Sequence, residues 1–358
     1  MGLPKITISL SKKASTLIKR SSRGVVVLLL KDDTNDDITT AVYTSADDAG
    51  ISADNWTAAN IDYIQKAFLG SPAKVICERI GASTSEETYT LDDALKRLST
   101  IKFNYLAMPE ADTEDVTAIS DWIKTQRSAK RYCKAVLANC DANDFGIINF
   151  TTEGIMVGTK SYSTAEYTAR LAGIFAGISL DRSATYFVLD EVTSITSSTT
   201  PDTDVDNGEL ILINDFEKIK IGRAVNSKKT LSAGEIEDMK KIKLTEAADM
   251  IKEDISTAFA DEYVGKVGNS YDNKVAFCAA INSYLKDITS EGVLYDKFDN
   301  SVSVDIAAQA AYLKSQDVDT SEMSDEEIKN YNTGSQVFIS GNIQFQDAME
   351  DLTLALSM

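Results

Sequence analysis

Histidine is absent from all 358 residues of the chain. Without an imidazole there is no Ser-His-Asp or Cys-His nucleophile, no histidine general base and no metal site that needs a histidine ligand. A catalytic site would have to rely on carboxylates, lysine or tyrosine. The absence therefore lowers the expectation of an enzyme and favours a structural or binding function.

Cysteine and proline are scarce, at four residues each. Cys77, Cys133, Cys140 and Cys278 form no CxxC motif, so we expect buried free thiols in a reducing compartment rather than a disulfide framework. The longest apolar run, VVVLLL at 25–30, is too short to span a bilayer. No apolar signal-peptide core follows the basic N-terminus. We therefore expect folding in a cytoplasm, without membrane insertion.

The formal net charge is −19, but residues 1–24 contain only basic charges. An acidic body argues against nucleic acid as the main partner. A basic leader on such a body predicts docking onto an acidic surface, in its own or another subunit, although a solvated tail is the alternative. The residues predicted to form inter-subunit ion pairs are Lys5, Lys12, Lys13, Asp347, Glu350 and Asp351.

The pattern of apolar residues predicts an α/β chain. Between 24 and 140, strands such as GVVVLLLKDD alternate with amphipathic helices, which is typical of a largely parallel sheet covered by helices. Helical patterns dominate at 232–264 and 271–288, so the C-terminal part is predicted to be α+β. Local patterns add further predictions: a helix that starts with a capping box of Ser163 and Glu166, a strand at 184–192, a surface loop at 193–208, a turn at Asn214-Asp215, a strand followed by a helix at 301–315, and a short capped helix at 324–331. The predicted divisions are an arm and linker at 1–23, an α/β body at 24–228, a helix-rich domain at 229–334 and C-terminal strands at 335–358. A further division of the body near 90–150 is left open.

Each end of the sequence alternates apolar and polar residues with a period of two, which predicts a β-strand with one apolar face. Such a strand can add to the sheet of another subunit, where backbone hydrogen bonds give strength and alternate side chains set the register. Burying Leu352, Leu354 and Leu356 would contribute about 5–8 kcal/mol before ordering costs. The predicted inter-subunit strand residues are Ile6, Ile8, Leu10, Leu352, Leu354, Leu356 and Met358.

Three short patterns were weighed as chemical sites. GNSYDNK at 268–274 groups a tyrosine, an aspartate and a lysine, but it equally predicts a helix N-cap. DTDVDNGE at 202–209 lacks the glutamate that completes a calcium loop, since position 213 is Ile213. GTKSYST at 158–164 lacks the glycine spacing of a phosphate-binding loop. We predict no catalytic residue, no metal and no cofactor.

Several segments, in this order, resemble the contractile tail sheath proteins of myovirus-type phages, PBSX-like prophages and R-type bacteriocins. The opening at 1–32 resembles the start of the small prophage sheath proteins. LAGIFAGISLDRSATYFVLDEV at 171–192 and IGRAVNSKKTL at 221–231 are similar to the family's helix-to-strand segment and its following strand. Residues 236–288 resemble the helical part of the family's C-terminal domain.

The resemblance implies a structural protein, a virion component rather than an enzyme. Sheath subunits stack as six-membered rings around a tail tube, exchange β-strands through their arms, and contract to drive the tube through a target cell envelope. The implied partners are copies of the chain itself, the tail tube protein, and baseplate and terminator proteins. The implied location is the host bacterial cytoplasm during assembly, and afterwards a phage tail or bacteriocin particle. Flexible linkers are expected at 11–24 and 333–336.

Two other functions compete with this interpretation. One is a histidine-free α/β hydrolase or ligand-binding protein. The other is a pilus or surface-layer subunit that also assembles by strand exchange, against which the expected absence of a signal peptide argues.

Overall fold

The computed structural model describes residues 18–20, 23–81 and 89–357. The chain divides into two compact units. The first comprises Ser21–Glu253 with Asp347–Met358, and the second comprises Asp254–Gln346 with Met1–Arg20. The following predicted residues lie outside the described ranges: Lys5, Ile6, Ile8, Leu10, Lys12, Lys13 and Met358.

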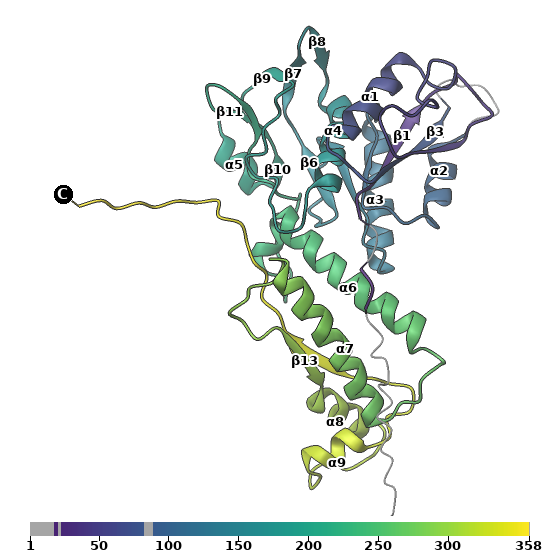
Figure 1. The fold of residues 1–358 in the computed structure, drawn as a ribbon, viewed down its shortest axis with the longest axis vertical. Coiled ribbons are helices and arrows are strands. Elements are labelled where there is room, and N and C mark those ends of the chain that lie inside the picture. Colours follow the sequence, from purple (N-terminus) through teal and green to yellow (C-terminus); the bar gives the residue numbers. More distant parts are fainter. Residues whose placement is uncertain (1–17, 21–22, 82–88, 358) are drawn as a thin grey trace, which may run out of the picture. The chain divides into compact units, whose positions relative to one another are not determined.

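A seven-stranded sheet forms the centre of the first unit, in the order β10-β6-β5-β4-β1-β3-β2 (Figure 1). All neighbouring pairs are parallel except β2 with β3. This confirms the predicted α/β class and the largely parallel sheet. The strands are β1 (Val25–Lys31), β2 (Thr40–Tyr43), β3 (Lys74–Ile80), β4 (Tyr105–Ala107), β5 (Lys134–Ala138), β6 (Ile147–Phe150) and β10 (Glu209–Leu210).

Helices cover both faces of this sheet. Because side chains alternate along a strand, Val26 and Leu28 of β1 point into one core and Val25 and Val27 into the other. The first core is closed by α1 (Ala58–Phe68) and α4 (Thr164–Gly177), and the second by α2 (Leu91–Leu98) and α3 (Thr113–Ser128). The apolar run at 25–30 is therefore a central strand buried on both faces, as predicted.

The helices α1 and α4 pack closely because α4 is rich in small residues. A Cβ atom on Gly173 would lie 2.0 Å from the carbonyl oxygen of Ala67, so no larger residue fits there. The predicted capping box is present, with Ser163 and Glu166 each bonding the other's backbone N–H.

Smaller antiparallel sheets complete the first unit. One has the order β8-β7-β9, and the other is the hairpin β11-β12, which confirms the predicted turn at Asn214-Asp215. The bounds are β7 (Glu153–Val157), β8 (Lys160–Tyr162), β9 (Val192–Thr196), β11 (Leu212–Asn214) and β12 (Ile219–Ile221).

Two local expectations were wrong in this region. A strand was expected at 184–192, yet only a single bridge at Val188 forms there and β9 begins at Val192. A loop was expected at 193–208, yet β9 and the short helix α5 (Pro201–Asp206) occupy it. Proline at the first helical position, with no N–H to satisfy, explains where α5 begins.

The second unit contains the end of α6 (Ile242–Glu262), then α7 (Tyr271–Ser290), α8 (Ile306–Ser315), α9 (Asp325–Asn330) and the hairpin of β13 (Ser301–Val304) with β14 (Ile339–Asn342). The predicted strand-then-helix at 301–315 and the capped helix at 325–330 are confirmed. None of the helices in the described ranges is long and apolar enough to cross a membrane.

Two expectations about α6 and the linkers were wrong. The helix predicted from Ser232 begins only at Ile242, after a short 3-10 turn (η1, Glu237–Lys240). Gly234 has a positive φ of 88°, and Lys241, directly before the helix, is extended and forms a bridge with Val225. The linker expected at 333–336 is held in place, since Thr333 is fully buried and Asn269 donates hydrogen bonds to its hydroxyl and to nearby carbonyls.

Candidate self-association sites

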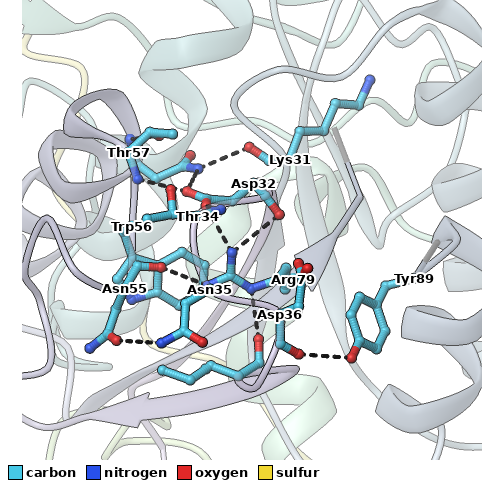
Figure 2. A network of polar contacts seen from close by, with 12 residues as sticks. Lys31, Asp32, Thr34, Asn35, Asp36, Asn55, Trp56, Thr57, Arg79 and Tyr89 are labelled. Carbon is cyan, nitrogen blue, oxygen red and sulfur yellow. Dashed lines mark hydrogen bonds and ion pairs between the residues drawn. The ribbon is translucent and has the colours of Figure 1, made fainter. Parts of the chain in front are cut away.

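The carboxyl edge of the central sheet, where α/β proteins commonly bind ligands, is filled in this chain by a buried ion pair (Figure 2). Asp32 follows β1 directly, and its Oδ1 lies 2.8 Å from Nη1 of Arg79 on β3. Both side chains are fully buried, and the guanidinium stacks on the ring of Trp56 at 4.5 Å. The other Asp32 oxygen accepts hydrogen bonds from the backbone of Thr57 and the side chain of Asn60.

These contacts connect β1, β3 and the start of α1 at this edge of the sheet. Burial alone would raise the pKa of Asp32, but hydrogen bonds from Thr57, Asn60 and Thr34 outweigh burial and lower the pKa to about 2. Thr57 is the N-cap of α1, so one carboxylate joins β1, β3 and the start of a helix. The geometry stabilises the sheet edge, because both charged groups, Asp32 and Arg79, are bonded within the protein, although Oδ1 of Asn60 is buried without a hydrogen-bond partner.

A second buried charge cluster holds the first half of α6 against the sheet. Lys134 Nζ lies 2.7 Å from Glu246 Oε2 and 2.9 Å from Asp249 Oδ2. Tyr105 donates a hydrogen bond of 2.8 Å to Glu246, and Arg23 also pairs with it. Because Arg23 lies two residues before the first residue of β1, this pair fixes the chain at the entry to the central sheet.

The pKa of Glu246 gives this cluster a pH signature. Burial alone would raise the pKa, but Lys134 and Arg23 outweigh burial and lower it from 4.5 to about 2. The cluster therefore contributes stability that is fully present above pH 4.5 and is lost as the pH falls toward 2.

We expect Glu246→Gln to lower the free energy of unfolding at pH 7 by on the order of 3 kcal/mol, since one pKa unit corresponds to about 1.4 kcal/mol. The difference from wild type should shrink steadily between pH 4.5 and pH 2. Urea unfolding at pH 7, 4, 3 and 2 measures it, with the exposed Glu237→Gln as the matched control. A difference that is constant with pH would contradict this assignment.

The segment after β14 returns to the first unit and is fixed there by acidic side chains. Arg223 lies 2.6 Å from Asp351 and 3.7 Å from Glu350. Lys241 lies 3.3 Å from Glu350 and also pairs with Asp347. Burial opposes the charge of Lys241, but these carboxylates outweigh burial and raise the pKa of Lys241.

The three carboxylates predicted to face another subunit's lysines are thus paired within their own chain. Ser183 adds a hydrogen bond of 2.9 Å to Glu350, whose side chain is only 5% exposed. Pairing of these carboxylates with Lys5, Lys12 and Lys13 of another copy stays a prediction, and such pairing would have to compete with Arg223 and Lys241.

Beyond these anchors the chain exposes a row of leucines. Leu352, Leu354 and Leu356 are 87%, 69% and 84% exposed. Residues 350–357 form no strand in the structure of the single chain. A lone extended segment has no partner for its backbone groups, so the predicted inter-subunit strand stays a prediction. The exposed leucines mark this segment as a surface to be covered.

The hairpin of β13 and β14 in the second unit has one closed edge and one open edge. The edge of β13 is closed, so only the edge of β14 can accept such a segment. The side-chain amide of Asn282 on α7 accepts a 2.8 Å bond from the N–H of Val302 and donates a 3.0 Å bond to its carbonyl. Both backbone groups of Val302 therefore point away from β14 and are already satisfied. This is the hydrogen-bond pattern of a neighbouring strand, supplied by one side chain on the β13 edge.

The other edge of the hairpin is open. Val302 and Gly341 are opposite each other in the hairpin. In an antiparallel pair, when the backbone groups of one residue point away from the partner strand, those of the residue opposite do so too, so the N–H and C=O of Gly341 point away from β13. By alternation Ile339 and Ile343 also point outward. Within the described residues, the sheet consists of β13 and β14 alone, and β14 is mostly exposed. A two-stranded hairpin is marginal by itself, so an added strand would stabilise it.

The three patterns weighed as chemical sites have simple structural explanations. Ser270 caps α7, and Pro201–Asp206 forms α5, while Gly158 lies in the turn between β7 and β8. All four cysteines are buried free thiols, as expected. Across the described ranges, no group of three or more cysteine and acidic side chains is placed to hold a metal ion.

Sequence reasoning missed Asn282, Arg223 and the pair of Asp32 with Arg79. Asn282 carried a weak signal, because asparagine is a poor helix former in the middle of an amphipathic helix. Arg223 lies inside the segment 221–231 that was singled out, although its acidic partners lie far along the chain. Asp32 and Arg79 each follow or occupy a buried strand, where an isolated charge requires a partner.

Comparison with known proteins gives a consistent result. Residues 81–227 match the phage tail sheath protein central domain, and residues 235–358 match the phage tail sheath C-terminal domain. A tail sheath protein of Clostridium phage phiCD119 is 38% identical over 371 residues, which cover 100% of this chain and 99% of that protein.

Solved structures with a similar fold are also sheath proteins. The contracted helical sheath of the anti-feeding prophage gives a TM-score of 0.68 at 14% identity, covering 100% of this chain and 99% of that one. The contracted PVC sheath complex of an extracellular contractile injection system gives 0.70 at 12% identity, covering 100% and 98%. A sheath tail protein from Listeria innocua gives 0.69 at 14% identity, covering 94% and 96%.

Proposed function

Because the chain belongs to the phage tail sheath protein family, we propose that its copies stack as six-membered rings around a tail tube. The chain is a structural subunit of a contractile sheath. Contraction of the stacked rings drives the tube through a target cell envelope. The partners in this assembly are other copies of the chain, the tube protein, and the baseplate and terminator proteins.

The copies are joined by strand exchange through their arms. The C-terminal segment of one copy adds to the open edge of β14 in another, and its exposed leucines are covered there. The observation that carries this proposal is the pair of hydrogen bonds from Asn282 to Val302. They occupy the β13 edge, so β14 provides the available edge of this hairpin. The N-terminal arm extends the same intermolecular sheet.

The donor segment at 352–356 and the acceptor edge at 339–343 have the same length. The outward positions Ile339, Gly341 and Ile343 span five residues, and the leucine row from Leu352 to Leu356 also spans five. Alternate side chains of an added strand lie on one face, so the three leucines would be buried together. Burying them would contribute on the order of 5–8 kcal/mol to the free energy of association, which is offset in part by the entropy cost of ordering the segment.

The ion pairs at the base of the segment determine where it leaves the body. Arg223 and Lys241 hold Asp351 and Asp347. The start of the segment is therefore fixed to the body, while the residues after Asp351 extend beyond it. Contraction is then a change between two packings of rigid bodies that stay connected by these arms. The proposed division is an arm and linker at 1–23, a body at 24–228, a helix-rich domain at 229–334, and a C-terminal part at 335–358 that holds the acceptor strand β14 and the donor arm.

Assembly takes place in the host bacterial cytoplasm, before the sheath becomes part of a released particle. The sheath function needs no active site and no cofactor. The filled sheet edge around Asp32 and Arg79 supports this proposal over a histidine-free hydrolase or ligand-binding protein.

The test replaces Leu352, Leu354 and Leu356 together by serine in the full chain. Negative-stain microscopy should show tubes or rings for the wild type and only dispersed subunits for the variant. A matched triple variant, Thr353→Ser with Ala355→Ser and Ser357→Thr, alters the polar positions between the leucines and should still assemble. Deletion of residues 1–15 should also abolish ordered tubes. Normal tubes from the leucine variant would contradict the proposal.

A further inference from the structure

A cavity of about 410 Å³ lies in the second unit, between the end of α6, the start of α7 and the segment before β14. Its apolar wall includes Phe259, Tyr263 and Phe277. The ring centres of Tyr263 and Phe277 are 4.5 Å apart, and those of Phe259 and Phe277 are 5.3 Å apart. Its size falls within the range of ordinary ligand sites, and it has ample room for an aliphatic side chain. We refer to it as the aromatic pocket.

A buried lysine without a counter-charge lines this pocket. Lys274 is only 3% exposed, and its ammonium bonds Gln309 Oε1 and Thr333 Oγ1, both at 3.0 Å. Both of these acceptors are neutral, and no carboxylate within the described ranges forms an ion pair with Lys274. Since an ammonium has three N–H donors, one donor remains for a further partner.

An unsatisfied acceptor lines the same pocket. The side-chain nitrogen of Asn269 donates to Thr333 Oγ1 and to the carbonyls of Gly334 and Gln336, which fixes the orientation of the amide. Its Oδ1 is buried and has no hydrogen-bond partner. A remaining donor on Lys274 and a free acceptor on Asn269 together match the C=O and N–H of a peptide backbone.

The pocket is continuous with the open edge of β14. Val337, which lines it, lies two residues before Ile339, the first residue of β14. If the leucine row pairs along Ile343, Gly341 and Ile339, the leucine at the Ile339 end of the row lies beside the beginning of β14, next to the pocket residue Val337.

We propose that the aromatic pocket receives a leucine side chain from residues 352–356 of a second copy, while Lys274 and Asn269 bond a peptide group of that strand. This inference rests on the proposed strand exchange and adds the site that selects the incoming segment. Backbone hydrogen bonds along a strand edge do not distinguish one register of the incoming strand from another. The pocket does, because it accepts a leucine side chain at one position only.

Charge favours the C-terminal segment over the N-terminal one. The leucine row follows Asp347, Glu350 and Asp351, whereas the apolar row at 6–10 is flanked by Lys5 and the lysines at 12–13. An uncompensated ammonium in the pocket repels the basic N-terminal segment, whereas the C-terminal segment, whose carboxylates are paired within their own chain, brings no positive charge to the pocket.

The test titrates a fluorescent peptide of residues 350–357 against the full chain whose own three leucines are replaced by serine. Gly268 lines the pocket, and a Cβ atom on it would meet no heavy atom within 4 Å, so Gly268→Leu fills the space without straining the backbone. We expect Gly268→Leu to weaken peptide binding at least about tenfold, and Gly268→Ser to leave it within about twofold. Thermal unfolding of both variants should match the parent chain.

The outcomes separate this inference from the proposed function. The peptide of residues 350–357 can bind in a way that Ile343→Pro abolishes and Gly268→Leu does not change. Strand exchange then stands and the pocket assignment is overturned. If a peptide of residues 3–12 binds more tightly than 350–357 and Gly268→Leu weakens it, the pocket serves the other arm and the inference is overturned. If the 350–357 peptide does not bind the parent chain at all, the proposed strand exchange itself fails.

Discussion

Ile343→Pro is expected to abolish tube formation while changing the free energy of unfolding by less than about 1 kcal/mol. The N–H of Ile343 points away from β13, so removing it costs no hydrogen bond within the hairpin. It does remove a donor from the edge that receives the incoming strand, and the ring obstructs the approach of that strand. The expected result is a folded subunit that cannot polymerise.

Two further variants make this result specific. Ile343→Ala keeps the N–H and should still form tubes, at reduced yield because a side chain is shortened. Asn342→Pro removes an N–H that faces Ser301 within the hairpin, so it should lower stability as well as assembly. Microscopy and urea unfolding of the three variants distinguish a blocked edge from a damaged hairpin. Normal tubes from Ile343→Pro would show that the β14 edge is not used.

The second large effect is expected at the buried ion pair. Arg79→Met should lower the free energy of unfolding by about 3–5 kcal/mol, because the Asp32 carboxylate would remain buried without its partner. The double variant Asp32→Asn with Arg79→Met should recover part of this loss, since the uncompensated charge is gone. Urea unfolding at pH 7 measures both.

The exposed pair of Lys96 with Asp93 provides the control. Lys96→Met should change the free energy of unfolding by less than about 0.5 kcal/mol, as is usual for a surface pair. A similarly small effect for Arg79→Met would mean that water reaches Asp32 in solution and that the sheet edge is open to ligands. That result would restore the hydrolase or ligand-binding alternative.

The sequence predicted those features that depend on neighbouring residues. The run at 25–30 predicted a central strand, and Ser163 with Glu166 predicted a helix start. Each of these is a local pattern whose cause lies within a few residues. The alternating leucines predicted an inter-subunit strand, which stays a prediction, and in the single chain they form an exposed row.

The features that sequence reasoning missed depend on distant partners. Asn282 acquires its role only because α7 places it against Val302, twenty positions further along the chain. Glu350 was assigned to another subunit because nothing in the sequence indicates that Arg223 and Lys241 lie beside it. The late start of α6 depends in part on the bridge of Lys241 with Val225, a partner outside the helical pattern, and that pattern also concealed the local break at Gly234.

Under the proposed strand exchange, Asn282 and the anchored leucine segment would together limit uncontrolled association of the chain. A hairpin with two open edges could take strands on both sides and form aggregates. Closing one edge with a side chain leaves a single route for addition, and fixing the base of the donor segment prevents it from folding back freely. Both features are built from residues inside the described ranges, and both are compatible with a sheath whose connections persist through contraction.

The most direct measurement is an electron cryomicroscopy map of the assembled tube at a resolution that separates β-strands. The account predicts an added strand, contributed by residues 350–357 of another subunit, hydrogen-bonded to the outer edge of β14 at Gly341, with Asn282 still bonded to Val302. An empty β14 edge, or an added strand beside β13 in place of Asn282, would contradict it.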